Sequence, residues 1–492
     1  MNLTEEQKNI ITTDLNRGEI LKVVAFAGTG KTTTLIQYAK YRPHLRFLYV
    51  AFNKSVQLEA SSKFPSNVVC KTAHSLAWKD FGSKYKDKII PNLKANTVVD
   101  VLDLPDYLSA QFTIDTLIRY LISSDDVISK RHIPMLAFEC YSDKKKTVPN
   151  FVELANNLWK SMRDQTTSEI GMLHDGYLKL YQLSQPFLRF DYILLDEAQD
   201  INPVIKDIVL SQFCPRIIVG DPHQQIYSFR GASNIIQEIE SDKTLYLTHS
   251  FRFGNQIASV ANQILNTFKN ERNKLVGLKG EGTIGTIPEN YTTIARTNAS
   301  IFDEAASLYK NKKIAFIGGV EGYRFDEIVD TYYLYSNKKS KIQNPYIKSF
   351  DTYFKMKDFA EEVQDLEILS RCGVVDRYKE KILKIVPEIK KAAVEVNKAE
   401  VVFTTAHKAK GLEFDNVKLL DDFPIVVKNK KLVDNKEIPN DEFNLMYVSV
   451  TRAKEKLKLS KNLEDFIDLN NKTVPAESNN KKGRSVMKRV KN

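Results

Sequence analysis

The sequence predicts an α/β fold with two doubly wound parallel sheets and helical insertions. Short apolar, β-branched runs at 21–24, 46–52 and 190–195 are typical of buried parallel strands, and helical segments lie between them. A glycine-rich turn at 25–32 joins the first run to a helix. A second series of strand-like runs begins at 244–247, which indicates a duplicated architecture.

Composition limits the classes of protein to which the chain can belong. The 492 residues are enough for several domains, and 42% apolar with 27% charged residues is typical of a globular protein. No run of 18 apolar residues and no signal peptide is evident, so we expect a cytoplasmic protein without a membrane partner. The four cysteines are far apart, which argues against zinc, iron–sulfur and disulfide scaffolds. The net charge of +11 is compatible with nucleic acid, although excess lysine also serves solubility.

The turn at 25–32 (AFAGTGKT) has the pattern of a phosphate-binding loop between a strand and a helix. Its glycines allow backbone N–H groups to point at a polyanion, and the helix N-terminus favours negative charge. Lys31 would reach the β- and γ-phosphates, and Thr32 would bind Mg²⁺. Ala25 replaces the first glycine of the pattern, and a glycine-rich turn with an unrelated lysine is the alternative. The ATP-binding residues expected here are Ala27, Gly28, Thr29, Gly30, Lys31, Thr32 and Thr33.

Changes in periodicity along the chain divide it into domains. A short helix is expected within 4–15. Helical periodicity without strands indicates one insertion from 97–122 and 150–163 and a second from 358–370 and 378–396. The predicted domains are a first α/β domain at 1–77 and 169–243 with a helical insertion at 78–168, a second at 244–320 and 399–469 with a shorter insertion at 321–398, and a disordered basic tail at 470–492.

Two adjacent carboxylates, Asp196 and Glu197, follow the buried strand at 190–195. Ligands of open α/β sheets bind at this end of a strand. Asp196 could hold Mg²⁺ while Glu197 orients and deprotonates an attacking water, which is most of what phosphoryl transfer requires. A solvated acidic strand end is the alternative, and the phosphate-binding loop upstream argues against it.

The segment 196–200 (DEAQD) resembles the corresponding box of superfamily-1 helicases of the UvrD/PcrA/Rep type. Two residues depart from the family's pattern. In the segment 50–54, Phe52 stands one place away from the family's aromatic residue, and in the segment 250–252, Phe251 stands where the family has a tyrosine. Two further segments, 174–180 and 317–320, resemble the helicase core of the F-box DNA helicases. The other motifs of the superfamily follow in order at Gln7, 50–54 (VAFNK), 72–75 (TAHS), 220–232 (GDPHQQIYSFRGA), 250–252 (SFR), 405–414 (TAHKAKGLEF) and 447–453 (YVSVTRA).

This resemblance implies two RecA-like P-loop domains and roles in ATP hydrolysis for individual residues. Gln7 would read the adenine, Phe251 would stack on it, and Glu413 would contact the nucleotide. Gln224 would sense the γ-phosphate. A cleft between two sheets would bring Arg252 and Arg452 to the γ-phosphate, where guanidinium groups neutralise charge. Surface salt bridges are the alternative for these two arginines.

A strand-binding surface is expected after the γ-phosphate sensor. Tyr227 and Phe229 alternate with Ser228 and Arg230, so both rings could stack on bases over a basic groove, with a core strand as the alternative. The residues expected to bind DNA are Asn53, His74, Tyr227, Phe229, Arg230, Thr405, His407 and Lys410, with the two histidines resting mainly on the resemblance.

The expected function is ATP-driven translocation on single-stranded DNA, in the 3′ to 5′ sense by resemblance, with Mg²⁺ as cofactor. Single-stranded DNA and its junctions with duplex are the expected partners, in repair, recombination or defence. Two alternatives stay open: an ATP-gated regulatory subunit of a larger nuclease or defence complex without unwinding, and a DNA-binding module that uses ATP only as a structural ligand.

Overall fold

The computed structural model describes residues 3–142, 148–166, 169–227, 234–362 and 365–473. The chain forms two compact units. Unit 1 comprises Met1–Thr283, Ala406–Asn416 and Asn440–Lys456. Unit 2 comprises Ile284–Thr405, Val417–Pro439 and Leu457–Asn492. The domain boundaries expected from the sequence stay a prediction, because compactness groups the chain by a different criterion.

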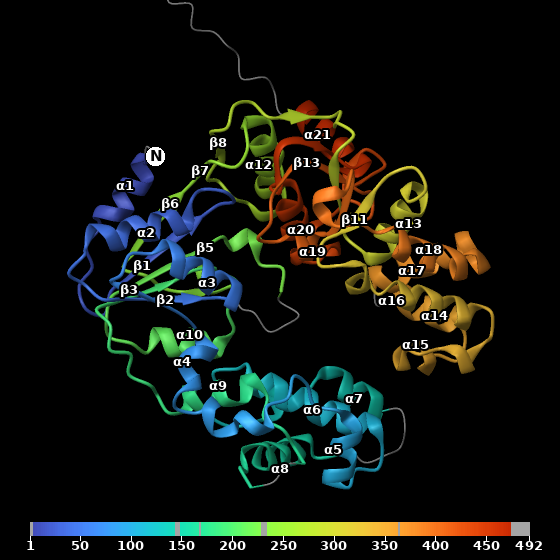
Figure 1. Cartoon of the computed structure of the whole chain (residues 1–492), viewed down its shortest axis with the longest axis horizontal. Coiled ribbons are helices and arrows are strands. Elements are labelled where there is room, and N and C mark those ends of the chain that lie inside the picture. The colour runs from blue at the N-terminus through green and yellow to red at the C-terminus, as the bar shows by residue number, and fades with distance from the viewer. Residues whose placement is uncertain (1–2, 143–147, 167–168, 228–233, 363–364, 474–492) are drawn as a thin grey trace, which may run out of the picture. The chain divides into compact units, whose positions relative to one another are not determined.

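Unit 1 is built on a six-stranded sheet with strand order β3-β2-β4-β5-β1-β6 (Figure 1). All its pairings are parallel, so the carboxyl ends of all six strands lie at one edge, called here the carboxyl edge. This confirms the predicted α/β class. The strands are β1 (Ile20–Ala25), β2 (Phe47–Ala51), β3 (Val68–Thr72), β4 (Tyr192–Leu195), β5 (Arg216–Gly220) and β6 (Lys243–Leu247).

The expectation that residues 244–247 begin the second sheet is wrong. They form β6, which pairs in parallel with β1 from Leu21↔Lys243 to Ala25↔Leu247. A single apolar strand carries no information about which sheet it joins, because its partners are set by tertiary structure.

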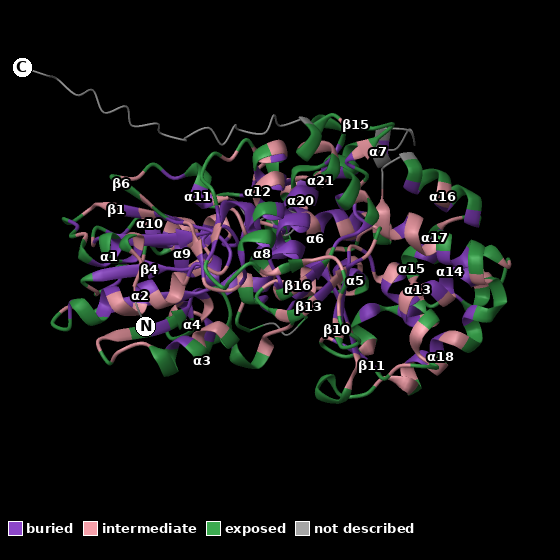
Figure 2. Cartoon of the chain, turned by 90° about the horizontal axis from the view of Figure 1, so that it is seen from above, coloured by how far each residue is buried: buried purple, intermediate pink, exposed green. Residues whose placement is uncertain are grey.

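Alternating strand residues bury against helices on both faces of the sheet. Phe47 and Tyr49 belong to one apolar cluster, and Leu48 and Val50 belong to another on the opposite face. Figure 2 shows the strands buried beneath more exposed helices. The first helix begins where Thr4 and Gln7 form a capping box. The helices are α1 (Glu5–Thr12), α2 (Lys31–Tyr41), α3 (Lys54–Lys63), α4 (Ala73–Trp78), α9 (His174–Leu183), α10 (Pro203–Leu210), α11 (Ile235–Glu238) and α12 (Asn255–Lys269).

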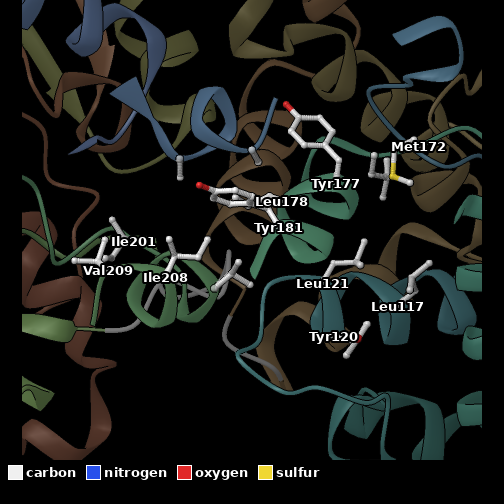
Figure 3. Packing of buried hydrophobic residues seen from close by; sticks show 14 of the residues in the cluster. Leu117, Tyr120, Leu121, Met172, Tyr177, Leu178, Tyr181, Ile201, Ile208 and Val209 are labelled. Atoms are coloured by element: carbon white, nitrogen blue, oxygen red, sulfur yellow. The ribbon is translucent and has the colours of Figure 1, made fainter. Parts of the chain in front are cut away.

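The first insertion is helical, as predicted. Its core is continuous with one face of the sheet, because side chains of α6, α9 and α10 pack together (Figure 3). Figure 3 shows Leu117 and Leu121 of α6 facing the helix that carries Tyr177 and Tyr181. The helices of the insertion are α5 (Ala95–Leu102), α6 (Tyr107–Leu121), α7 (Met135–Ser142) and α8 (Phe151–Arg163).

Unit 2 carries most of a second six-stranded sheet, of order β11-β12-β10-β13-β16-β9, in which β10 pairs in parallel with β12 and β13. The strands are β9 (Thr283–Ile284), β10 (Tyr291–Ala295), β11 (Ile314–Phe316), β12 (Val401–Thr405), β13 (Phe414–Leu419) and β16 (Ala453–Lys458). Two small sheets also occur, β7 (His249–Ser250) with β8 (Val276–Gly277) and β14 (Val427–Lys428) with β15 (Lys431–Leu432).

The second insertion is also helical. It forms α14 (Phe325–Tyr335), α15 (Pro345–Ser349), α16 (Tyr353–Glu362), α17 (Leu366–Tyr378) and α18 (Ile382–Ala392). The remaining helices are α13 (Asn298–Leu308), α19 (Ala406–Ala409), α20 (Asn440–Val450) and α21 (Lys461–Thr473). The predicted tail therefore begins too early, because residues 470–473 continue α21; residues 474–492 lie outside the described part.

Candidate nucleotide-binding site and DNA-contacting residues

The glycine-rich turn lies at the carboxyl edge of the first sheet, between β1 and α2. Gly28 and Gly30 have φ values of +74° and +79°, which disfavour other residues. Space is also limited, because a Cβ on Gly28 would lie 2.5 Å from Ser250 Oγ. Ala25 is the last residue of β1 and is fully buried, so the position where the pattern has its first glycine is ordinary strand. The turn thus has the open backbone that a phosphate group needs.

The predicted metal ligands and catalytic carboxylate meet beside this turn. Thr32 Oγ1 donates to Asp196 Oδ2 at 3.1 Å, and the Tyr49 hydroxyl donates to the same oxygen at 2.9 Å. Lys31 Nζ lies 2.9 Å from Glu197 Oε2. Glu197 has a φ of +52°, a strained conformation for a residue with a side chain and one that is common at functional sites. The two pairs of residues predicted from separate motifs, Lys31 with Thr32 and Asp196 with Glu197, therefore lie together.

Ionisation of the two carboxylates differs although they are adjacent. Burial and then the Glu197 charge raise the pKa of Asp196. Burial acts in the same direction on Glu197, but the ammonium groups of Lys31 and Lys410 outweigh it and lower the pKa of Glu197. Glu197 is thus held as the charged form that a general base requires.

The two residues predicted to contact adenine, Gln7 and Phe251, lie against Gly30. A Cβ on Gly30 would lie 3.0 Å from Gln7 Nε2 and 3.6 Å from the Phe251 ring. The Gln7 amide accepts from Thr4 N at 3.1 Å and donates to Thr34 Oγ1 at 3.2 Å, which leaves one N–H of the amide for a ligand. The predicted base-reading and base-stacking residues are thus brought together.

Gln224 belongs to a buried network that reaches the glycine-rich turn. Its Nε2 donates to Asp221 Oδ2 at 2.6 Å. The Tyr447 hydroxyl donates to that same oxygen at 3.0 Å and accepts from Ala27 N at 3.0 Å. Gln199 Oε1 accepts from Asp221 N at 3.1 Å. A change at the turn can therefore reach Gln224 through three hydrogen bonds in series, by way of Tyr447 and Asp221.

Both predicted arginines lie in unit 1. Arg452 is 1% exposed, and its Nη2 lies 3.4 Å from Gln224 Oε1. Arg252 forms an ion pair with Glu413 at 2.9 Å and donates to the Thr451 carbonyl at 3.1 Å. Burial, and then the nearby Arg252 guanidinium, lower the pKa of Arg452. An anion between the two arginines would offset this repulsion, as the γ-phosphate hypothesis requires.

Three predicted DNA-contacting residues form a cluster. The Tyr227 hydroxyl donates to the His407 carbonyl at 3.2 Å, and the Lys410 ammonium lies 5.2 Å from the centre of the Tyr227 ring. The Lys410 side chain is only 9% exposed, because it forms an ion pair with Asp200 at 2.5 Å and donates to the Gln224 carbonyl. This conformation does not present Lys410 to a DNA phosphate, so that contact stays a prediction.

The other predicted DNA contacts are dispersed. Asn53 caps α3 after β2, and His74 lies in α4 after β3, so both lie at the carboxyl edge of the first sheet. His74 Nε2 is 3.2 Å from Asp175 Oδ1. Thr405 is buried at the end of β12 in unit 2. Phe229 and Arg230 lie outside the described residues.

The described residues contain neither a cluster of metal-binding side chains nor a membrane-spanning helix. Within the described ranges no group of three or more His, Cys, Asp or Glu residues could hold a metal ion. Mg²⁺ commonly binds one or two carboxylates together with substrate phosphates, so the oxygens of Thr32 and Asp196 fit it without such a cluster. No described helix is long and apolar enough to cross a membrane.

Comparison with known families decides where the chain belongs. The UvrD-like helicase C-terminal domain matches residues 135–464, more than half of the chain. The chain belongs to the UvrD-like helicase family. An AAA domain also matches residues 7–230. UvrD-like domains have RecA-like folds, which confirms the predicted RecA-like architecture of the two parallel sheets.

Known helicases are similar to this UvrD-like chain over different lengths. F-box DNA helicase 1 of Gallus gallus is 39% identical over 503 residues, covering 95% of this chain and 50% of the relative. F-box DNA helicase protein 1 of Schizosaccharomyces pombe is 32% identical, covering 93% and 57%. PcrA of Staphylococcus epidermidis is 22% identical, covering 54% and 40%. The chain thus spans about half the length of the F-box helicases it matches.

Sequence reasoning missed several residues of this UvrD-like site. Three of them lie inside the helicase-like motifs, although no pattern in the sequence assigns them a role: Gln199, Asp221 and Tyr447. A buried polar side chain between charged neighbours is the signal that could have pointed to them. Tyr49 lies within an apolar strand, and nothing in the sequence marks its hydrogen bond to Asp196.

Proposed function

We propose that this UvrD-like chain is an ATP-driven translocase on single-stranded DNA that moves 3′ to 5′ and unwinds duplex or displaces bound proteins. One observation carries the proposal. The glycine-rich turn, the paired carboxylates, Gln224 and Arg452 share one network of hydrogen bonds in unit 1. That arrangement supports an active ATPase site rather than a site where ATP is only a structural ligand.

The chemistry of this site follows from the positions of its residues. Lys31 leaves its pair with Glu197 to bind the β- and γ-phosphates, which frees the carboxylate to take a proton from water. Thr32 and Asp196 would hold Mg²⁺, which supplies positive charge at the phosphate oxygens. Arg252 and Arg452 neutralise charge that develops on the γ-phosphoryl group.

Coupling to DNA is proposed to run through Gln224. Its side chain faces Arg452, and its carbonyl accepts from Lys410, whose ammonium lies against the Tyr227 ring. A change in the γ-phosphate would shift Gln224 and then Tyr227, so nucleotide state and DNA affinity would be linked reciprocally.

A second candidate is an ATP-gated regulatory subunit of a larger nuclease or defence complex. The chain spans about half the length of the F-box helicases it matches, so its similarity to them does not establish that it has the activity of those whole proteins.

We propose a cytoplasmic location, junctions of single-stranded with duplex DNA as substrates, and a pathway in repair, recombination or defence.

Duplexes with either a 3′ or a 5′ single-stranded tail test the proposal. ATP-dependent strand separation is expected from the 3′-tailed duplex alone, with ATP hydrolysis stimulated by single-stranded DNA. DNA-stimulated hydrolysis without strand or protein displacement would favour the regulatory subunit. ATP hydrolysis at a rate that does not change when DNA is added would contradict both the translocase and the regulatory subunit.

A further inference from the structure

Trp78, the last residue of α4, packs against Tyr177 and Gly82 and yet remains 41% exposed. Its indole meets the Tyr177 ring edge to face, with ring centres 5.9 Å apart at 80°. Gly82 packs against the six-membered ring, because a Cβ at Gly82 would lie 2.7 Å from Trp78 Cε3. Gly82 has no positive φ, so close approach to the indole is what favours glycine there.

The position of this indole is informative. α4 follows β3 directly, so Trp78 lies one helical turn after His74 at the carboxyl edge of the first sheet. His74 also packs against Tyr177, with ring centres 5.9 Å apart. Lys79, the residue after Trp78, is exposed. Asp80 is exposed next to Lys79 and Asp175 faces His74, so Lys79 is the cationic group that this part of α4 offers to a phosphate.

We propose that Trp78 is a stacking platform for an unpaired base of single-stranded DNA. This rests on the proposed function, since it adds a contact to the same DNA surface. An aromatic ring fixed from two sides loses little freedom when a base covers it, and stacking tolerates any base because every base has a π-face. The exposed Lys79 beside it suits the sugar–phosphate backbone.

The chain has two tryptophans, so tryptophan fluorescence can be used to test whether a base stacks on Trp78. Trp159 is 4% exposed in the helical insertion, so quenching of tryptophan fluorescence by a stacked base would report on Trp78. Titration of the full chain with oligo-dT is expected to quench fluorescence, with anisotropy of a labelled oligo-dT following binding separately. Trp78→Phe should still bind but lose the quenching.

Affinity provides the second measurement. Trp78→Ala should weaken oligo-dT binding about five- to 100-fold, which is the loss of one stacked base. Phe187→Ala is the matched control, because Phe187 is 76% exposed and precedes β4 at the opposite edge of the sheet. Its affinity should equal that of the wild type.

The results of these binding experiments distinguish failure of the Trp78 stacking role from failure of the proposed function. Tight binding of oligo-dT without quenching, or unchanged affinity of a stably folded Trp78→Ala variant, would overturn the stacking role alone. Absence of any oligo-dT binding by the wild type would overturn the proposed function as well. If Trp78→Ala unfolds, the comparison of wild type with Trp78→Phe still decides.

Discussion

Arg452 and Gln224 face one another in the interior of unit 1, with Nη2 of the arginine 3.4 Å from Oε1 of the glutamine. Arg452 has no carboxylate within ion-pair distance in the part of the chain that is described, although it is almost completely buried. A buried guanidinium without an anionic partner is costly, and bound ATP would supply that partner.

Replacing Arg452 should therefore abolish most ATP hydrolysis. Arg452→Ala should lower kcat by about 10³-fold or more, because an arginine that stabilises the transferred phosphoryl group contributes about 10³–10⁵. Arg452→Lys should restore little, since an ammonium lacks the planar fork. Steady-state hydrolysis with saturating single-stranded DNA measures both, with the exposed Arg131 changed to Lys as control. Full activity of Arg452→Lys would mean that the fork is not needed.

Glu197→Gln should separate binding from hydrolysis. The amide cannot accept the proton of the attacking water, so kcat should fall about 10²–10⁴-fold. ATP binding should persist, because Asp196 and Thr32 still contact one another. Fluorescent-nucleotide binding and phosphate release check the two steps, with the exposed Glu59 changed to Gln as control. Wild-type turnover would rule out Glu197 as the base.

Tyr447→Phe removes one hydroxyl that joins two segments. Ala27 N would lose its acceptor and Asp221 one of its donors, both in a buried site. The free energy of unfolding should fall by about 1–3 kcal/mol, the usual cost of leaving a buried polar group unpaired. Urea unfolding measures this, and Tyr107→Phe at an exposed site should change it by less than about 0.5 kcal/mol. Equal stabilities would show that the bridge is dispensable.

The contact between Glu271 and His223 should make the free energy of unfolding depend on pH. Glu271 Oε2 lies 3.0 Å from the buried His223 Nε2, and this hydrogen bond is the main cause that lowers the pKa of Glu271 to about 2. Because the pKa of Glu271 is lower in the folded protein than in the unfolded chain, the carboxylate raises the free energy of unfolding. This contribution is fully present above the unfolded-state pKa of about 4.5 and is lost as the pH falls towards 2.

Glu271→Gln should therefore be less stable than the wild type at pH 7 by up to about 2 kcal/mol, allowing for solvent screening, and the difference should shrink below pH 4.5. Urea unfolding of both proteins across this range measures the difference. A difference independent of pH would mean that the carboxylate charge contributes nothing.

The parts of the site that could be predicted are those encoded locally. The turn at 25–32, the pair Asp196–Glu197 and the arginines are recognisable because each has its chemistry within a few residues. Contacts between distant segments, such as Tyr447 with Asp221 or Lys410 with Asp200, depend on packing that no short pattern encodes. The same limit explains the strand at 243–247, whose apolar pattern suits either sheet.

The segments 406–416 and 440–456 pack within unit 1, although more than a hundred residues of unit 2 separate the first of them from the rest of unit 1. Proteins emerge from the ribosome with their N-terminal part first. A growing chain therefore displays its phosphate-binding turn long before Lys410, Tyr447 and Arg452 exist. Until they do, the turn lacks the hydroxyl that accepts from Ala27 and the guanidinium that faces Gln224. Under the proposed function, an unfinished chain would therefore lack part of the site that hydrolyses ATP.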